Sequence, residues 1–221
     1  IPIPKIIYLN SADELSANIA EINWYPVVVK PALSSTLEGQ RFLSGAIRYA
    51  SSPGELEQLY ATNPVLRYPS MIQEKIVGPG TGLFTLYDGN RHLALFSHRR
   101  VREKPPSGGV SVVSESIPLD QEMVDAADKL LSAVGWKGVA MVEFKRDQRD
   151  GKAKLMEING RFWGSLQLAI ACGVDFPALL LDYLQENLTE PLRSDYQIGH
   201  KLKWFFGTLD QVGKAADIPA D

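Results

Sequence analysis

Two acidic residues flank a predicted turn in the segment VAMVEFKRDQRDGKAKLMEING, residues 139–160. Asp150 and Gly151 are typical of a hairpin turn, and a hairpin symmetric about Asp150 places Glu143 opposite Glu157. Side chains at directly opposed positions have Cβ atoms roughly 4.5–5.5 Å apart. Two carboxylates held that close must share a proton or a cation. The segment therefore predicts a cation site on one face of the hairpin.

Asn159 extends this polar face, because side chains two residues apart in a strand point to the same side. It is predicted to oppose Met141. Two carboxylates and an amide oxygen form a hard, oxygen-only ligand set, which suits Mg²⁺ or Mn²⁺ and is unlike a zinc site. We therefore predict Glu143, Glu157 and Asn159 as metal ligands. The opposite face is suited to packing on a core and carries Val142, Phe144, Met156 and Ile158.

Two alternatives to a metal site stay open for this hairpin. If the polar face is turned to solvent, its acids need no partner. Lys145 or Arg161 could also neutralise the two acids locally. The register of the hairpin decides the matter, because a shift of one residue moves every side chain to the other face.

A lysine lies near the end of the apolar segment VVVKP, residues 27–31. Lys30 is followed by a loop that contains Ser34, Ser35, Thr36 and Gly39. A lysine in this position can bind phosphate as a point charge, while loop N–H groups and hydroxyls add donors. The Walker A pattern GxxxxGK[ST] is absent. The alternative is an ordinary surface lysine.

A run of basic residues occupies HRRVREK, residues 98–104. Alternation along a strand places Arg100, Arg102 and Lys104 on one face. This pattern is typical of a solvated basic edge strand, or of a cationic wall for an anionic substrate or a triphosphate. The following PPSGGVS, residues 105–111, is interpreted as a mobile flap because it contains glycines.

Composition limits the class of protein. The chain has 221 residues, is 45% hydrophobic and 22% charged, and has a formal net charge of −3, which suits one domain or two lobes. This slight acidity does not support nucleic-acid binding by bulk charge. No apolar run reaches the ~20 residues of a membrane span. Cys172 is the single cysteine and is predicted to be a core residue. Because one cysteine allows no disulfide within the chain, a reducing cytoplasm is the expected compartment.

Strand and helix signals are interleaved along the chain. Turn signals at Asp88-Gly89 and Asp150-Gly151 indicate hairpins. Helices are predicted after the capping patterns SADE, residues 11–14, and SPGE, residues 52–55. Apolar residues at helical spacing predict another helix within 119–136. Helices scattered among hairpin-linked strands favour an α+β fold over an alternating parallel sheet.

Four motifs, taken in order, resemble those of the ATP-grasp superfamily. They are VVVKP at 27–31, IQEKIVGPG at 72–80, VAMVEF at 139–144 and LMEINGRFWGS at 155–165. The resemblance extends over about residues 1–190 and is greatest to carboxylate–amine ligases related to carbamoyl-phosphate synthase and to biotin-carboxylase-like domains. It implies two α+β lobes, with mainly antiparallel sheets, that sandwich a nucleotide.

The resemblance also implies a domain organisation. Residues 1–76 would form a small nucleotide-binding lobe that ends at a hinge, and residues 77–221 a large lobe for metal and substrate. Family members usually carry a further N-terminal domain, which is expected to be missing from this chain. The chain is therefore expected to bind ATP weakly or to be inactive alone, with an N-terminal domain or a partner chain completing the site. A homodimer is a separate expectation.

Residue roles follow from the resemblance as expectations. Lys30, with Ser35 in its loop, would contact the ATP phosphates. Glu143 and Glu157 would hold two Mg²⁺ or Mn²⁺ ions with Asn159. Arg161, with Lys30, would be catalytic by holding the transferred phosphoryl group. The adenine would lie against the hinge residues Gln73, Glu74, Lys75, Ile76 and Val77, and the substrate against Arg100, Arg102, Arg161 and Ser165.

The chemistry implied by the resemblance has two steps. A carboxylate is activated by ATP as an acyl phosphate with release of ADP, and an amine or similar nucleophile then displaces phosphate. Ser165 stands where biotin-carboxylase-type members have a glutamate, which argues against carboxylation of biotin. A non-catalytic ATP-binding or regulatory module and an ATP-grasp small-molecule kinase stay open as alternatives.

Overall fold

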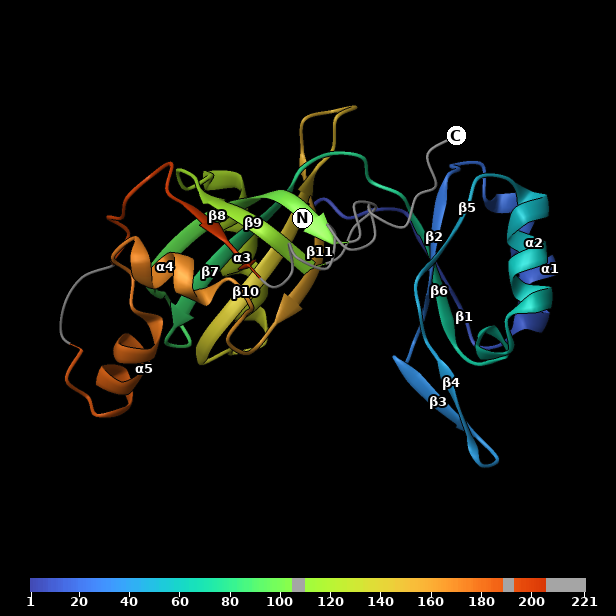
Figure 1. Cartoon of the computed structure of the whole chain (residues 1–221), viewed down its shortest axis with the longest axis horizontal. Helices are drawn as coiled ribbons and strands as arrows, with labels where there is room; N and C mark the ends of the chain where they lie inside the picture. The colour runs from blue at the N-terminus through green and yellow to red at the C-terminus, as the bar shows by residue number, and fades with distance from the viewer. Residues whose placement is uncertain (105–109, 189–192, 206–221) are drawn as a thin grey trace. The chain divides into compact units, whose positions relative to one another are not determined.

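The computed structural model describes residues 1–104, 110–188 and 193–205, and it divides the chain into two compact units. The small unit is Ile3–Ile76. The large unit combines Ile1–Pro2 with the chain from Val77 onward. Figure 1 traces both units along the chain. None of the helices within the described residues is long and apolar enough to cross a bilayer.

The small unit is built on a four-stranded antiparallel sheet in the order β1-β6-β2-β5. Its helices lie on one side of this sheet (Figure 1). A separate two-stranded hairpin follows β2. The strands are β1 (Ile6–Leu9), β2 (Val27–Pro31), β3 (Ser35–Glu38), β4 (Arg41–Ser44), β5 (Arg48–Ala50) and β6 (Ser70–Glu74). The helices are α1 (Leu15–Asn18) and α2 (Pro53–Thr62), with 3-10 turns at Ala12–Glu14, Ile19–Glu21 and Pro64–Arg67.

The two predicted helix caps of this unit have different outcomes. Ser52 caps α2 as predicted, because its hydroxyl accepts a hydrogen bond from the Glu55 N–H at 3.3 Å. The capping box predicted at 11–14 does not form. Ser11 makes no side-chain cap, and Glu14 instead accepts from the backbone N–H of Asn10 at 2.9 Å. The resulting helix α1 has four residues between two 3-10 turns.

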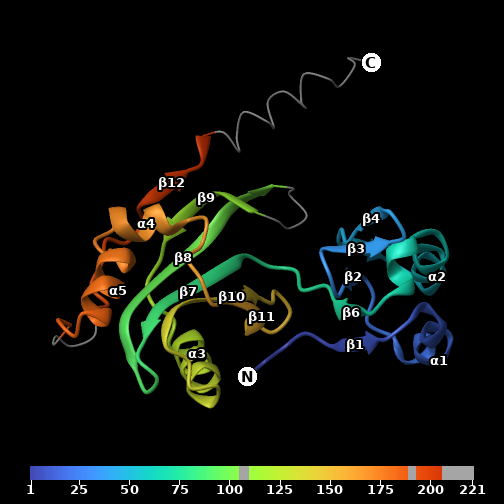
Figure 2. The ribbon, with the colours of Figure 1, turned by 90° about the horizontal axis from the view of Figure 1, so that it is seen from below.

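The large unit contains a six-stranded antiparallel sheet in the order β11-β10-β7-β8-β9-β12. The helix α3 covers one face, and α4 with α5 covers part of the other (Figure 2). The strands are β7 (Gly80–Tyr87), β8 (His92–Lys104), β9 (Val110–Ser116), β10 (Gly138–Arg146), β11 (Ala153–Asn159) and β12 (Lys201–Lys203). The helices are α3 (Gln121–Ala133), α4 (Leu166–Ala171) and α5 (Phe176–Leu184). The predicted α+β class is confirmed.

Alternate side chains of the long strands pack against different helices on the two faces of this sheet. Leu83, Leu95 and Phe144 pack with α3, whereas Phe84, Phe96 and Met141 pack with the helical layer on the opposite face. The buried core residues on that opposite face include Trp163, Leu168 and Phe176. Cys172 is also buried there, as predicted.

The face covered by α4 and α5 continues beyond these helices and changes from apolar to polar. On β8 the alternating residues run from Ala94 and Phe96 to His98 and Arg100. On β10 they run from Met141 to Glu143. A single sheet face thus supplies part of the hydrophobic core at one end and a polar site at the other.

Candidate active site

The hairpin of β10 and β11 places Glu143 directly opposite Glu157 and Met141 opposite Asn159. Both pairings were predicted and are confirmed. The predicted pairing of Lys145 with Leu155 is wrong, because Lys145 opposes Lys154. A bulge between Glu143 and Phe144 accounts for the difference, since it adds one residue to β11 after Leu155.

The apolar face predicted for this hairpin is only partly buried. Val142 and Phe144 on β10 are fully buried against the α3 side of the sheet. Ile158 was predicted to pack on the core, but 43% of it is exposed. The reason is that β11 is an edge strand, and Ile158 lies near its end.

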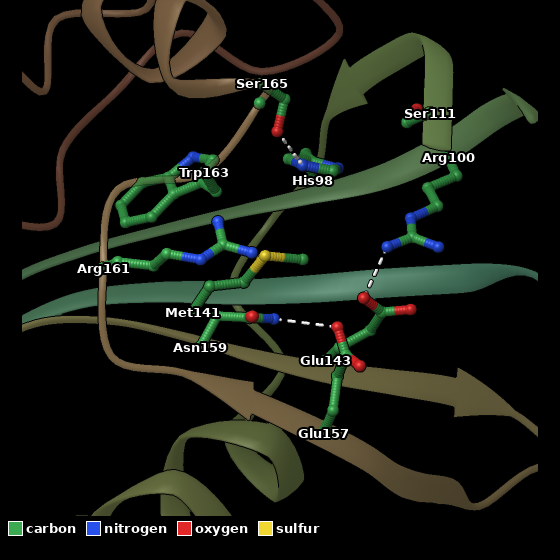
Figure 3. Close-up of a pocket in the computed structure, with 11 residues that line it drawn as sticks. His98, Arg100, Ser111, Met141, Glu143, Glu157, Asn159, Arg161, Trp163 and Ser165 are labelled. Carbon is green, nitrogen blue, oxygen red and sulfur yellow. Dashed lines mark hydrogen bonds and ion pairs between the residues drawn. The ribbon is translucent and has the colours of Figure 1, made fainter. Parts of the chain in front are cut away.

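A pocket of about 230 Å³ opens over the polar part of the sheet face. Four of its lining residues are predicted site residues from the carboxylate hairpin and the segment after it: Glu143, Glu157, Asn159 and Arg161. Figure 3 shows their side chains around one space. The remaining lining residues are His98, Arg100, Ser111, Met141, Trp163, Gly164 and Ser165.

Glu143 is the buried carboxylate of the pair, whereas Glu157 is exposed. Burial raises the pKa of Glu143 above its usual range, and the charge of Glu157 acts in the same direction, while Arg100 opposes both. Glu157 accepts a hydrogen bond from the side-chain nitrogen of Asn159 at 2.8 Å. This bond uses the amide nitrogen of Asn159 and not its oxygen.

The cation that contacts Glu143 is Arg100, through an ion pair with Oε2 of the carboxylate. Neither of the local cations suggested by the sequence takes this place in the pair. Arg161 instead donates from Nη1 to the backbone oxygen of Phe162 at 3.0 Å. Arg100 also donates to Glu103 at 3.1 Å. Arg100 was predicted as a substrate residue, and its contact with a metal-ligand candidate was not foreseen.

The oxygen-rich set in this pocket fits a divalent cation of the magnesium type. Two carboxylates and one amide are a suitable protein share for Mg²⁺, which keeps waters and takes further oxygens from substrate phosphates. Among the residues that the structure describes, no group of three or more His, Cys, Asp or Glu side chains forms a metal cluster. Any cation here would therefore depend on Asn159, water or a substrate for its other ligands.

The basic strand β8 does not carry a continuous basic face. Register irregularities lie between Arg100 and Arg102 and between Arg102 and Glu103. Arg102 is exposed and is not among the lining residues of the pocket. Arg99 forms a surface ion pair with Glu115 at 2.7 Å. The predicted flap falls mainly on residues 105–109, which lie outside the described part of the chain together with the side chain of Lys104.

The predicted nucleotide-binding residues lie mostly in the small unit. Lys30 lies in β2 opposite Met71, and Ser35 begins β3. Gln73 and Glu74 end β6, and the Glu74 carboxylate accepts from the Lys5 N–H at 3.1 Å. Because these residues and the carboxylates belong to different units, their joint site stays a prediction.

The rest of the predicted hinge spans the passage between the two units. Lys75 Nζ lies 5.0 Å from the centre of the Tyr49 ring. Ile76 is buried and is the last residue of the small unit. Val77 is exposed, and its carbonyl accepts from the Gln148 N–H at 3.0 Å.

An aromatic cluster supports the pocket, and the sequence did not reveal it. The Phe84 ring stacks on His98 at 4.6 Å and contacts Trp163 at 4.4 Å, both measured between ring centroids. A Cβ on Gly82 would lie 2.6 Å from this ring, so the missing side chain makes room for Phe84. The pattern GTG at 80–82, within an otherwise apolar strand, was the available signal.

Comparison with known proteins identifies the family. Residues 88–204, more than half of the chain, match a family model described as "ATP-grasp in the biosynthetic pathway with Ter operon". The chain belongs to the ATP-grasp family. The resemblance inferred from the four motifs is thereby confirmed, and no curated protein matches the sequence.

Solved structures support the same fold for this ATP-grasp protein. Biotin carboxylase from Campylobacter jejuni is 18% identical with a TM-score of 0.68, over 91% of this chain and 46% of its own. An L-amino acid ligase from Bacillus licheniformis is 22% identical with a TM-score of 0.58, over 87% and 45%. The ATP-grasp ligase PsnB, complexed with a minimal precursor, is 15% identical with a TM-score of 0.57, over 85% and 56%. The chain spans about half the length of these structures.

Proposed function

We propose that this chain is the ATP-grasp part of an ATP-dependent ligase that activates a carboxylate as an acyl phosphate and passes it to an amine. The observation that carries the proposal is the pairing of Glu143 with Glu157 in a pocket that also holds Arg100 and Arg161. Oxygen ligands for a divalent cation and guanidinium groups for phosphate are the two features that phosphoryl transfer needs.

In this proposal Glu143, Glu157 and Asn159 would hold two Mg²⁺ or Mn²⁺ ions, and ATP would bind with them. The ions supply charge neutralisation and orientation when they are bound. Lys30 and Ser35 contact the phosphates. The adenine lies along residues 73–77, where the Val77 carbonyl already accepts from Gln148, so that an adenine contact would use the Val77 N–H.

Arg161 holds the transferred phosphoryl group, and Arg100 and Arg102 attract the anionic substrate. A substrate carboxylate oxygen attacks the γ-phosphorus, and the bond from that phosphorus to the ADP oxygen breaks. The amine nitrogen then attacks the acyl carbon, the bond from carbon to the phosphate oxygen breaks, and the amine proton leaves with phosphate. Trp163 and Met141 line the pocket and limit access of water to the acyl phosphate.

The names of structural neighbours suggest substrate classes to test. They include an L-amino acid ligase and a ligase bound to a precursor peptide, and the family description refers to a biosynthetic pathway. Amino acids and short peptides are therefore the first panel of carboxylates and amines. A cytoplasmic location stays a prediction.

The test of the site combines binding with turnover. Mn²⁺ binding should be measured by calorimetry in the presence of a non-hydrolysable ATP analogue, and ADP release should be measured with the substrate panel. Glu157→Gln is expected to weaken metal binding and to abolish carboxylate-dependent ADP release. Glu115→Gln is the matched control, because Glu115 is an acid of the same sheet that pairs with Arg99.

If Glu157→Gln leaves metal binding and turnover unchanged, the assignment of the site is wrong. A second candidate function is a non-catalytic ATP-binding part of a larger enzyme, which is favoured by the chain's coverage of about half of its neighbours. Binding of nucleotide and metal without turnover in the complete protein would support that alternative. A stable phosphate ester among the products would indicate a kinase.

A further inference from the structure

His98 and Ser165 form a hydrogen-bonded pair on a different wall of the pocket from the carboxylates. His98 Nε2 lies 2.7 Å from Ser165 Oγ. In the view of Figure 3 the Arg161 side chain reaches toward the middle of the pocket, with this pair on one side and the Glu157 carboxylate on the other. If Arg161 holds the phosphoryl group on the metal side, the pair lies on the other side, where the amine that attacks the acyl carbon would be placed.

The orientation of His98 is fixed by its surroundings. The residue is 1% exposed, and its ring stacks on Phe84 with a tilt of 27°. The Phe84 ring in turn contacts Trp163 and fills the space over Gly82. Nε2 of His98 therefore keeps its direction toward Ser165.

His98 is also uncharged. Burial, assisted by the charge of Arg100, lowers the pKa of His98 to about 3. Its Nδ1 atom is buried without a hydrogen-bond partner in the described structure, which a charged imidazolium would not tolerate. The pair thus contributes hydrogen bonding and no charge to its wall of the pocket.

The remaining charges of the pocket balance one another. Its described lining contains two carboxylates, Glu143 and Glu157, and two guanidiniums, Arg100 and Arg161. The nearest of the four to His98 along β8 is Arg100, which follows it by two residues on the same face of the strand and lowers its pKa. The guanidinium of Arg100 disfavours an ammonium group beside the pair, so an amine that binds there is uncharged.

We propose that Ser165 receives an N–H of the uncharged amine nucleophile and that His98 is the positioning residue that aims the Ser165 hydroxyl. This inference rests on the proposed ligase function and specifies its second substrate. The Ser165 oxygen accepts the hydrogen bond from the amine, whose nitrogen keeps its lone pair for the acyl carbon.

The pair can be tested without any substrate. The chain has three histidines, so the ring nitrogens of His98 can be assigned by NMR in the full ¹⁵N-labelled chain with His98→Gln as the reference. His98 should stay neutral from about pH 5 to 8, and one ring nitrogen should shift in Ser165→Ala. Ser111→Ala is the matched control, since Ser111 also lines the pocket but donates to the Val113 carbonyl.

The role toward the amine needs two rates, measured with amino acids as carboxylates and as amines. Positional isotope exchange in ATP reports activation of the carboxylate, and mass spectrometry of the amide reports ligation. Ser165→Ala should lower kcat/KM for the amine about tenfold relative to the exchange rate, as expected for one lost hydrogen bond. Ser111→Ala should leave that ratio unchanged, and His98→Gln should retain more of it than Ser165→Ala.

Three outcomes overturn the inference. The first is titration of His98 near its usual pKa, or ring nitrogens that ignore Ser165→Ala. The second is an equal fall of both rates in Ser165→Ala. The third is isotope exchange with no amide from any amine, which leaves the activation step standing. Absence of exchange with every carboxylate instead removes the proposed function, and this inference with it, whatever His98 does in the substrate-free measurement.

Discussion

Arg100 and Glu143 form an ion pair across strand β7, although their own strands, β8 and β10, are not neighbours. Gly80 and Gly82 of β7 lie between the two partner strands and have no side chains to separate the pair. A Cβ on Gly80 would lie 3.1 Å from Cδ of Arg100. The two paired side chains are 13% and 11% exposed. A divalent cation that binds Glu143 must therefore displace this guanidinium or share the Glu143 carboxylate with it.

Removal of the guanidinium should strengthen binding of metal alone. Arg100→Gln frees Glu143 from its ion pair and deletes a like charge next to the incoming cation. Mn²⁺ affinity without nucleotide, measured by calorimetry, should rise roughly tenfold, which corresponds to ~1.4 kcal/mol. Arg99→Gln is the control, because Arg99 pairs with Glu115 at the surface. Equal effects of the two substitutions would show that only net charge matters.

Because His98 is buried, the free energy of unfolding should decrease in acid. The pKa of its side chain falls from 6.5 to about 3 because the residue is buried. Below pH 6.5 the unfolded chain takes up a proton that the folded protein refuses, so stability decreases as pH falls toward 3. The loss approaches about 1.4 kcal/mol per pH unit inside this window. Urea unfolding of wild type should show this extra slope, and His98→Gln should lack it; parallel pH profiles would contradict the burial argument.

Gly160, between Asn159 and Arg161, should not tolerate a methyl group. A Cβ at this position would lie 2.3 Å from Cη2 of Trp136. Gly160→Ala should therefore lower the free energy of unfolding by about 1–3 kcal/mol, as overpacked sites do. Trp136→Leu in the same chain should recover part of the loss. Gly164→Ala has open space around its Cβ and should have little effect; a similar cost for both alanines would point to backbone flexibility.

Gly82 should be more sensitive to alanine than Gly80. A Cβ on Gly82 would lie 2.6 Å from the Phe84 ring, which would have to move from its stack with His98. A Cβ on Gly80 would meet the far ends of Arg100 and Glu103, which can yield. We expect Gly82→Ala to cost about 1–3 kcal/mol and to shift the His98 ring signals, while Gly80→Ala does less. The reverse order would exclude the proposed role of the aromatic cluster.

The hairpin that carries the carboxylates was predictable because its information is local. The turn at Asp150-Gly151 and the alternation around Glu143 and Glu157 lie within one short segment, and the structure confirms that these acids oppose each other. The bulge was not predictable. Between the turn and Phe144 the pairing differs by one residue from the predicted register, and the extra residue in β11 brings Glu143 and Glu157 back into it. The register was thus right at the acids and wrong at Lys145.

The contacts that cross the sheet could not be predicted from sequence patterns. Arg100 and Glu143 are 43 residues apart, and their contact depends on the order of strands and on glycines in a third strand. His98 belongs to an alternation that looks like core, because Ala94 and Phe96 precede it. Its position in the pocket can be inferred only when it is known where α4 and α5 cease to cover this face of the sheet. The exposure of Ile158 likewise depends on the position of β11 at the sheet edge.

The bulge in β11 has a consequence for changes in chain length. Leu155 opposes Phe144 and Glu157 opposes Glu143, so Met156 between them is surplus to the ladder. Deletion of Met156 would leave both pairings in place and convert the hairpin into a regular one. A strand that bears a metal-ligand candidate therefore contains one residue of spare length, next to the acid whose position matters most.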